Sequence, residues 1–186
     1  MPSPQRDLPP DAEAPEEVVW EGRFVIAKKR GRWEYVSRAR NIRAALILAI
    51  DDDGHVLLVE QYRVPMGRRS LEVPAGLIGD GDDANEEAEL AALRELEEET
   101  GYRAARIEDC GHFYSSPGML SESFYLFRAT GLTKVGAGGG TESEDITVHR
   151  VPLDEVPAFV EERRRAGIGV DAKLLLLLGA SIIGRE

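Results

Sequence analysis

Apolar and polar positions alternate in short runs through the first half of the chain, a pattern that predicts β-strands separated by turns. The runs 18–26 and 33–36 lie on either side of a basic turn and predict a small hairpin or meander. The runs 44–50 and 55–61 flank Asp51-Asp52-Asp53-Gly54, a strong turn sequence. These two runs therefore predict a central hairpin.

The second half of the chain mixes helical and extended patterns. Residues 86–100 are good helix formers, and Gly101 follows them where a helix favours a left-handed cap. Short strands are predicted at 70–73, 124–129 and 146–151. Strands and helices do not alternate regularly, so the pattern favours an α+β fold or a mixed-sheet sandwich over a doubly wound sheet.

Two helices are predicted to close the chain, at 153–166 and 171–183. The second holds the most apolar run of the sequence, from Leu174 onward. This run is much shorter than the roughly 20 residues that a bilayer span needs. We therefore expect a buried helix.

Composition and charge narrow the range of partners. The 186 residues carry a formal net charge of −11, which opposes nucleic acids and anionic membranes as main partners and favours metal cations. The single Cys110 cannot form an internal disulfide, and the start of the chain lacks the pattern of a signal peptide, so we expect a cytoplasmic protein. The Pro-rich, acidic start is expected to be a loose tail over 1–17.

Most of the excess negative charge lies in one segment. Residues 80–99 contain ten carboxylates and a single basic residue, Arg94. Glu95, Glu98 and Glu99 share one helix face in the last turn before Gly101, where they repel one another and oppose the helix dipole. Such a face is either solvated surface, with Arg94 pairing to Glu98, or a site for a hard divalent cation.

The string Arg94-Glu95-Leu96-Glu97-Glu98-Glu99-Thr100-Gly101-Tyr102 decides between these alternatives. It resembles the signature of the Nudix hydrolases, G-x5-E-x7-R-E-U-x-E-E-x-G-U with U apolar, and Glu86 stands at the matching distance before Arg94. Position 80 is Asp instead of Gly, and the matching glycine is Gly76, so the loop 77–85 is four residues longer than in the signature.

Three further motifs resemble the ADP-ribose pyrophosphatase branch of that family: residues 60–63 (EQYR), 71–76 (LEVPAG) and 116–118 (SPG). The resemblance implies an α+β fold of the Nudix type, an α/β/α sandwich with a mixed β-sheet between helices. It also implies a small N-terminal β subdomain over 18–40, which helps to form a homodimer, and a hydrolase domain over 41–186.

The resemblance assigns a metal site to the acidic helix. Glu95 and Glu99, with the backbone carbonyl of Ala75, would hold Mg²⁺, or Mn²⁺ in its place, and Glu98 would join them directly or through water. Arg94 would orient this cluster. A diphosphate substrate fits, because an acidic helix would repel it unless metal ions bridged the two.

The resemblance also implies residues that bind the nucleotide. Arg63 would clamp a phosphate, and Arg38 would reach the active site from the first domain, since a planar guanidinium suits phosphate. Phe24 and Trp33 either belong to the core of the small subdomain or stack on the adenine. Gly118 and Met119, beside the family's proline at Pro117, complete the predicted substrate contacts.

The base that activates water is expected on the segment that follows Gly136–Gly140, where relatives carry a glutamate. Glu142 and Glu144 both qualify, and Glu98 is the next candidate. A run of four glycines among five residues predicts a loop that is mobile without ligand.

The resemblance therefore implies Mg²⁺-dependent hydrolysis of ADP-ribose to AMP and ribose 5-phosphate. Two alternatives stay open: hydrolysis of another nucleoside diphosphate sugar, such as a GDP-sugar or ADP-glucose, and a sensor that binds nucleotide without cleaving it. The complete glutamate cluster argues against the sensor, because a binding module does not need the metal ligands.

Overall fold

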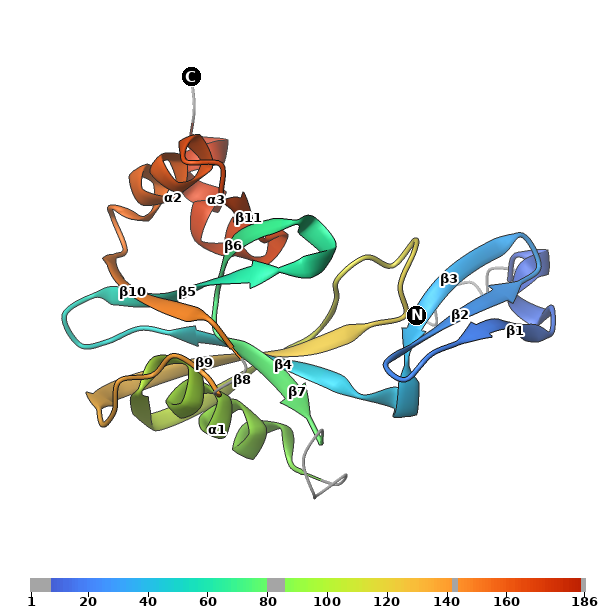
Figure 1. Ribbon diagram of the computed structural model, residues 1–186, viewed down its shortest axis with the longest axis horizontal. Coiled ribbons are helices and arrows are strands. Elements are labelled where there is room, and N and C mark those ends of the chain that lie inside the picture. The colour runs from blue at the N-terminus through green and yellow to red at the C-terminus, as the bar shows by residue number, and fades with distance from the viewer. Residues whose placement is uncertain (1–7, 80–85, 142–143, 185–186) are drawn as a thin grey trace, which may run out of the picture. The chain divides into compact units, whose positions relative to one another are not determined.

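The computed structural model describes residues 8–79, 86–141 and 144–184, and the chain divides into two compact units (Figure 1). The first unit combines Met1–Arg43 with Phe113–Phe124. The second combines Ala44–His112 with Tyr125–Glu186.

The structure contains strands, α-helices and short 3-10 helices. The strands are β1 (Glu16–Glu21), β2 (Val25–Arg30), β3 (Trp33–Arg38), β4 (Arg43–Ala49), β5 (His55–Arg63), β6 (Arg68–Glu72), β7 (Ala75–Ile78), β8 (Tyr102–Tyr114), β9 (Ser123–Lys134), β10 (Ile146–Pro152) and β11 (Gly169–Val170). The helices are α1 (Ala88–Thr100), α2 (Val156–Arg165) and α3 (Leu175–Ile183), with 3-10 turns η1 (Pro10–Glu13), η2 (Ala39–Asn41), η3 (Val64–Met66) and η4 (Ala172–Leu174).

The first unit is built on an antiparallel sheet in the order β1-β2-β3, so the predicted meander is present. The basic residues at 28–30 belong to β2 itself, and the turn is at 31–32. The predicted tail includes the 3-10 turn η1, which is tied to that turn by Asp11, whose carboxylate accepts hydrogen bonds from the backbone N–H and the guanidinium of Arg32. Val36 in β3 bonds to the segment 113–124 through Met119 and Ser121.

The second unit contains a four-stranded sheet in the order β10-β5-β6-β11. It also contains most of a second four-stranded sheet, in the order β7-β4-β9-β8. The predicted hairpin of β4 with β5 is therefore wrong, although both strands and the turn between them are present. A single bridge, Ile50 to Val56, joins the two runs before they enter different sheets. In place of β4, β5 pairs with β6, which follows it in the chain, and with the distant β10 along seven residue pairs.

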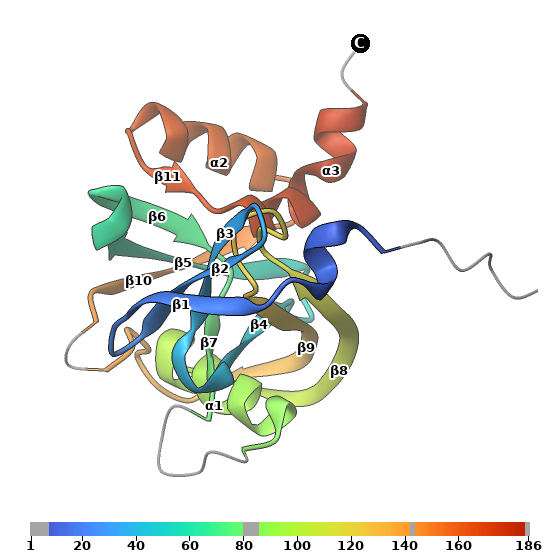
Figure 2. The same cartoon turned by 90° about the vertical axis from the view of Figure 1, so that its right-hand side faces the viewer.

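In the second unit, α1 lies on one side of the two sheets and α2 and α3 lie on the other (Figures 1 and 2). The main apolar core joins α1 to β4 and β9, where Ile47, Leu96 and Phe127 are fully buried. The long strand β8 was not predicted from the sequence. A mixed arrangement of strands between helices confirms the α+β class.

The C-terminal helix departs from the expected burial. Leu174, in η4, is fully buried, but the structure shows no buried residue in α3, where Leu175 and Leu176 are each 54% exposed. The apolar run was correctly assigned to a helix and wrongly assigned to the interior. Among the described residues, no helix combines the length and apolar character needed to cross a bilayer.

Candidate active site

Helix α1 brings the predicted glutamates together at its C-terminal end. Its apolar side, with Ala91, Ala92 and Leu96, is fully buried against the sheets. The three glutamates on the other side differ in exposure. The side chain of Glu98 is 43% exposed and that of Glu95 is 12% exposed, whereas the whole residue Glu99 is 4% exposed. Gly101 caps the helix with φ 73°, as predicted.

Arg94 holds one side of this cluster. Its Nε donates to Glu86 Oε1 at 3.1 Å, and its Nη1 donates to Glu95 Oε1 at 2.8 Å and to Glu98 Oε2 at 3.3 Å. The hydrogen bonds to Glu86 raise the pKa of Arg94, and the same contact lowers the pKa of Glu86. The predicted Arg94–Glu98 pair is thus one part of a wider network, and the arrangement suits an orienting residue.

Glu99 occupies the deepest position. Its Oε2 accepts a hydrogen bond of 3.0 Å from the backbone N–H of Ala75, at the start of β7. Its pKa is raised to about 8, mainly by burial and also by the negative charges of Glu95 and Glu144, against the lowering effect of that hydrogen bond. A buried carboxyl held among other carboxylates fits a site that a divalent cation would complete, because the cation reverses the sign of these repulsions.

Gly76 permits this close packing of β7 on α1. A Cβ atom at position 76 would lie 1.8 Å from the Glu95 carboxyl carbon. The glycine of the LEVPAG motif is therefore explained by space: without a side chain, the β7 backbone can approach the carboxylates. Ala75 and Glu95 thus belong to one compact site, as the metal prediction requires.

A second acidic group lies in the turn between β4 and β5. Among the described residues, ligand atoms of Asp51, Asp53 and His55 all lie within 4.8 Å of one another. The guanidinium of Arg150 already bonds this turn, through Asp51 Oδ2 at 2.6 Å and Asp53 Oδ2 at 2.7 Å. The protein therefore supplies its own cation here, and the α1 cluster is the better metal candidate.

The glycine run contacts the end of α1 directly. The backbone N–H of Gly139 donates to Glu99 O at 2.8 Å, and that of Gly140 donates to Glu98 O at 3.0 Å. A Cβ at Gly138 would lie 2.4 Å from the carbonyl carbon of Thr100. Close approach to the helix end thus gives a second reason for the glycines, beside the mobility that the sequence predicts, and that mobility stays a prediction.

Of the two candidate bases on this segment, only Glu144 lies among the described residues. Glu142 lies outside the described residues, as does the 80–85 part of the longer loop. Glu144 is exposed, and its Oε2 accepts hydrogen bonds from the Thr141 N–H at 2.8 Å and the Thr141 hydroxyl at 3.1 Å. Its charge acts on Glu99, which places it within electrostatic reach of the cluster.

Arg63, the predicted phosphate clamp, is engaged by a carboxylate. Its Nε donates to Glu72 Oε1 at 2.8 Å and its Nη2 donates to Glu72 Oε2 at 2.7 Å. These hydrogen bonds raise the pKa of Arg63, with Glu99 adding a smaller effect of the same sign. Arg63 therefore lies near the α1 glutamates, but a phosphate would have to compete with Glu72 or use the remaining donors.

The other predicted substrate contacts belong to the first unit, and the structure brings only some of them together. Arg38 Nε donates to Glu122 Oε1 at 2.5 Å. Trp33 and Gly118 line one apolar pocket of about 420 Å³. Phe24 and Met119 are not among the residues that line it and are 63% and 59% exposed.

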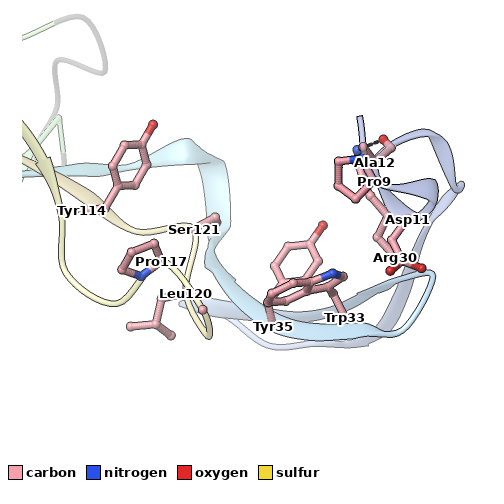
Figure 3. Close-up of a pocket in the computed structure, with 11 residues that line it drawn as sticks. Pro9, Asp11, Ala12, Arg30, Trp33, Tyr35, Tyr114, Pro117, Leu120 and Ser121 are labelled. Atoms are coloured by element: carbon pink, nitrogen blue, oxygen red, sulfur yellow. Dashed lines mark hydrogen bonds between the residues drawn. The ribbon is translucent and has the colours of Figure 1, made fainter. Parts of the chain in front are cut away.

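That pocket adds residues that the sequence analysis missed. Tyr35 and Tyr114 line it with Trp33 and Pro117 (Figure 3). Trp33 and Tyr35 stand two positions apart on β3, so strand periodicity alone places them on one face of the sheet. The two-residue spacing of Trp33 and Tyr35 was therefore the signal in the sequence that could have identified Tyr35. Glu72 was also missed, although it stands inside the LEVPAG motif.

Known proteins resemble this chain in both sequence and fold. Residues 40–168 match the family described as NUDIX domain. The methanol dehydrogenase activator of Bacillus methanolicus is 37% identical over 155 residues, which cover 80% of this chain and 82% of that protein. The ADP-ribose pyrophosphatase of Bacillus subtilis (strain 168) is 39% identical over 121 residues, which cover 64% and 63% of the two chains.

A solved structure, that of an ADP compounds hydrolase, superposes with a TM-score of 0.66 at 24% identity and covers 92% of this chain and 95% of its own. The likeness at that identity concerns the fold, and it confirms the predicted architecture. The glutamate signature on α1, the match over 40–168 and the relatives agree, and the chain belongs to the Nudix hydrolase family.

Proposed function

We propose that this protein hydrolyses the diphosphate link of ADP-ribose, so that water and ADP-ribose give AMP and ribose 5-phosphate. The observation that carries the proposal is the carboxylate cluster of α1, with Glu99 buried and bonded to Ala75. The similarity to an ADP-ribose pyrophosphatase supports this choice of substrate.

Glu95, Glu98, Glu99 and the carbonyl oxygen of Ala75 would hold Mg²⁺, or Mn²⁺ in its place. Hard carboxylate and carbonyl oxygens are the ligands that both ions favour. When bound, the ion supplies charge that offsets the diphosphate and lowers the pKa of the attacking water.

The remaining steps fall to the chain's own side chains. Glu142 or Glu144 would accept the proton of the attacking water, with Glu98 as the next candidate. Arg63 would bind a phosphate oxygen, and Arg94 would keep Glu95 and Glu98 oriented.

Recognition of the nucleoside is proposed for the first unit. Trp33 and Gly118 offer an apolar surface suited to a planar base, and Tyr35 and Tyr114 extend it. Phe24, Arg38 and Met119 would contact the substrate from outside this pocket. A homodimer and a cytoplasmic location belong to the same proposal, the latter because Cys110 is the only cysteine.

One substrate screen tests the proposal. The full chain would be incubated with ADP-ribose, ADP-glucose or a GDP-sugar, in Mg²⁺, in Mn²⁺ and in chelator, while AMP, GMP and sugar phosphate are measured. We expect the highest kcat/KM for ADP-ribose and no release in chelator. Preference for another compound would replace ADP-ribose within the same chemistry, and binding without cleavage would favour the sensor.

A further inference from the structure

Arg69, in β6, has no role in the function proposed above. Its guanidinium nevertheless donates hydrogen bonds to several acceptors, which lie on two different segments of the chain. Its Nε donates to Glu60 Oε1 at 2.7 Å and its Nη2 to Glu60 O at 2.9 Å. On the other side, Nη1 donates to Asp145 Oδ2 at 2.5 Å, and Nη2 to Asp145 O at 3.2 Å and Thr147 Oγ1 at 3.3 Å. The side chain thus joins the sheet to the residue that directly follows Glu144.

The sheet side of this contact is rigidly held. The Glu60 side chain is 8% exposed, and its Oε2 lies 3.3 Å from His149 Nε2 and 3.8 Å from Arg163 Nη1. A buried carboxylate is costly unless it is paired, so Glu60 fixes the position of the Arg69 guanidinium. Arg69 can therefore serve as a fixed point for a more exposed partner.

The exposed partner is the segment that carries the candidate base. The Asp145 side chain is 80% exposed, and both its carboxylate and its carbonyl oxygen bond Arg69. On the other side of Glu144, Gly139 and Gly140 bond the carbonyls of Glu99 and Glu98, which carry predicted metal ligands. The segment is thus tied to the metal helix before Glu144 and to Arg69 immediately after it.

We propose that Arg69 is a positioning residue that acts through Asp145 to hold the Glu144 carboxylate in reach of the metal cluster. The inference rests on the proposed function and takes Glu144, one of its two loop candidates, as the base of that reaction. A planar guanidinium with several fixed acceptors resists rotation, whereas a single surface ion pair does not. Loss of the contact should misplace the base and leave substrate binding largely unchanged.

The test compares Asp145→Ala with a matched variant, Asp53→Ala. Asp53 forms an Arg–Asp contact of 2.7 Å with Arg150, on the same sheet, and its side chain is 77% exposed, so the two substitutions remove similar surface groups. With ADP-ribose and Mg²⁺, we expect Asp145→Ala to lower kcat by about 10- to 100-fold with KM nearly unchanged. Asp53→Ala should keep the wild-type kcat.

Three further variants separate positioning from simple loss of structure. Asp145→Asn keeps an oxygen that can accept from Arg69, so we expect it to recover kcat to within a few-fold of wild type. Glu144→Gln should lower the same parameter, and the double variant Asp145→Ala/Glu144→Gln should be little worse than Glu144→Gln alone, because both changes affect one group. Additive losses would contradict the proposal.

Backbone hydrogen exchange gives a readout that does not depend on activity. We expect faster exchange over 144–147 in Asp145→Ala than in wild type or Asp53→Ala. Equal exchange, or a wild-type kcat in Asp145→Ala, would overturn the role of Arg69 while leaving the hydrolase intact. A wild-type chain that cleaves none of the screened compounds would instead contradict the proposed function, and the positioning role with it.

Discussion

At the scale of single residues, the site places the buried carboxyl of Glu99 close to the negatively charged Glu95 and Glu144. Glu99 is held by Ala75, and burial raises its pKa to about 8, so its environment disfavours the charged form in the absence of a cation. Such a group is poorly explained as a stabilising feature of the fold. It is readily explained as a ligand that becomes favourable when a metal ion is bound.

We therefore predict that Glu99→Gln lowers kcat by at least about 100-fold while the melting temperature is kept or raised. The amide oxygen can still accept from the Ala75 N–H, but it is a weaker metal ligand and removes the carboxylate repulsion. Steady-state kinetics in saturating Mg²⁺ and a thermal melt without metal would measure the two effects. The control is Glu97→Gln, on the same helix as Glu99, whose exposed carboxylate bonds Arg103 in β8. Near-normal turnover in Glu99→Gln would refute the metal assignment.

At the scale of secondary-structure elements, the sequence identified what is locally encoded and failed where the partner is distant. Helix α1 is set by its own residues and by the cap at Gly101, so its existence and its C-terminal end could be predicted. The turn at Asp51–Gly54 was also recognised, but β4 and β5 enter different sheets, where each pairs on one side with a strand far along the chain, β4 with β9 and β5 with β10. Local pattern carries no information on that choice.

The site shows the same division. The α1 glutamates follow from helical spacing and motif, whereas the Arg63–Glu72 and Arg69–Asp145 contacts depend on strand register and on chain segments 76 residues apart in the second case. The glycines at 138–140 were visible in the sequence, but the helix end that they approach was not. Tertiary contacts therefore decide which charged residues are free to bind substrate.

The leucine run tests how well burial explains stability at the junction of η4 and α3. Leu174 is fully buried, while Leu175, its neighbour, is 54% exposed. We predict that Leu174→Ala lowers the free energy of unfolding by about 2–5 kcal/mol through the cavity left behind, and that Leu175→Ala changes it by less than about 1 kcal/mol. Urea unfolding followed by far-UV circular dichroism would measure both; equal costs would contradict the observed burial.

The N-terminal sheet should lose stability in acid because of Glu16. Hydrogen bonds from Lys28, at 2.8 Å, and from Tyr35 lower the pKa of Glu16 from 4.5 to about 2, and Arg30 contributes a weaker bond. A carboxyl whose pKa is lower in the folded state stabilises the fold above pH 4.5. This contribution is lost as the pH falls from about 4.5 towards 2.

Tryptophan fluorescence can follow this sheet alone, because both tryptophans of the chain, Trp20 and Trp33, lie in β1 and β3. We expect the stability measured at these probes to fall between pH 4.5 and 2 in wild type and to depend less on pH in Glu16→Gln. Glu17→Gln, which leaves the Glu16 hydrogen bonds in place, should behave as wild type. Identical pH profiles for all three proteins would contradict the role of Glu16.

At the scale of the whole molecule, the first unit leaves apolar surface that a stable monomer would be expected to cover. All six residues of β1 are exposed, and Val18, Val19 and Trp20 follow one another at 57%, 66% and 58% exposure. Because successive side chains of a strand point to opposite faces, both faces of β1 present apolar groups. An uncovered edge strand of this kind is also open to pairing with another chain.

We therefore predict a homodimer in which the segment 18–36 is covered by the partner and lies near its active site. Light scattering should give about twice the 20.5 kDa chain mass, and Val19→Lys should reduce it to the monomer, because a buried, unpaired charge would oppose association. The exposed valine at 19 should tolerate lysine without unfolding, which the melting temperature would verify. If the dimer completes the site, kcat/KM for ADP-ribose should fall with dissociation and recover as the protein concentration of the variant rises. A monomeric wild-type protein with full activity would rule out this assembly.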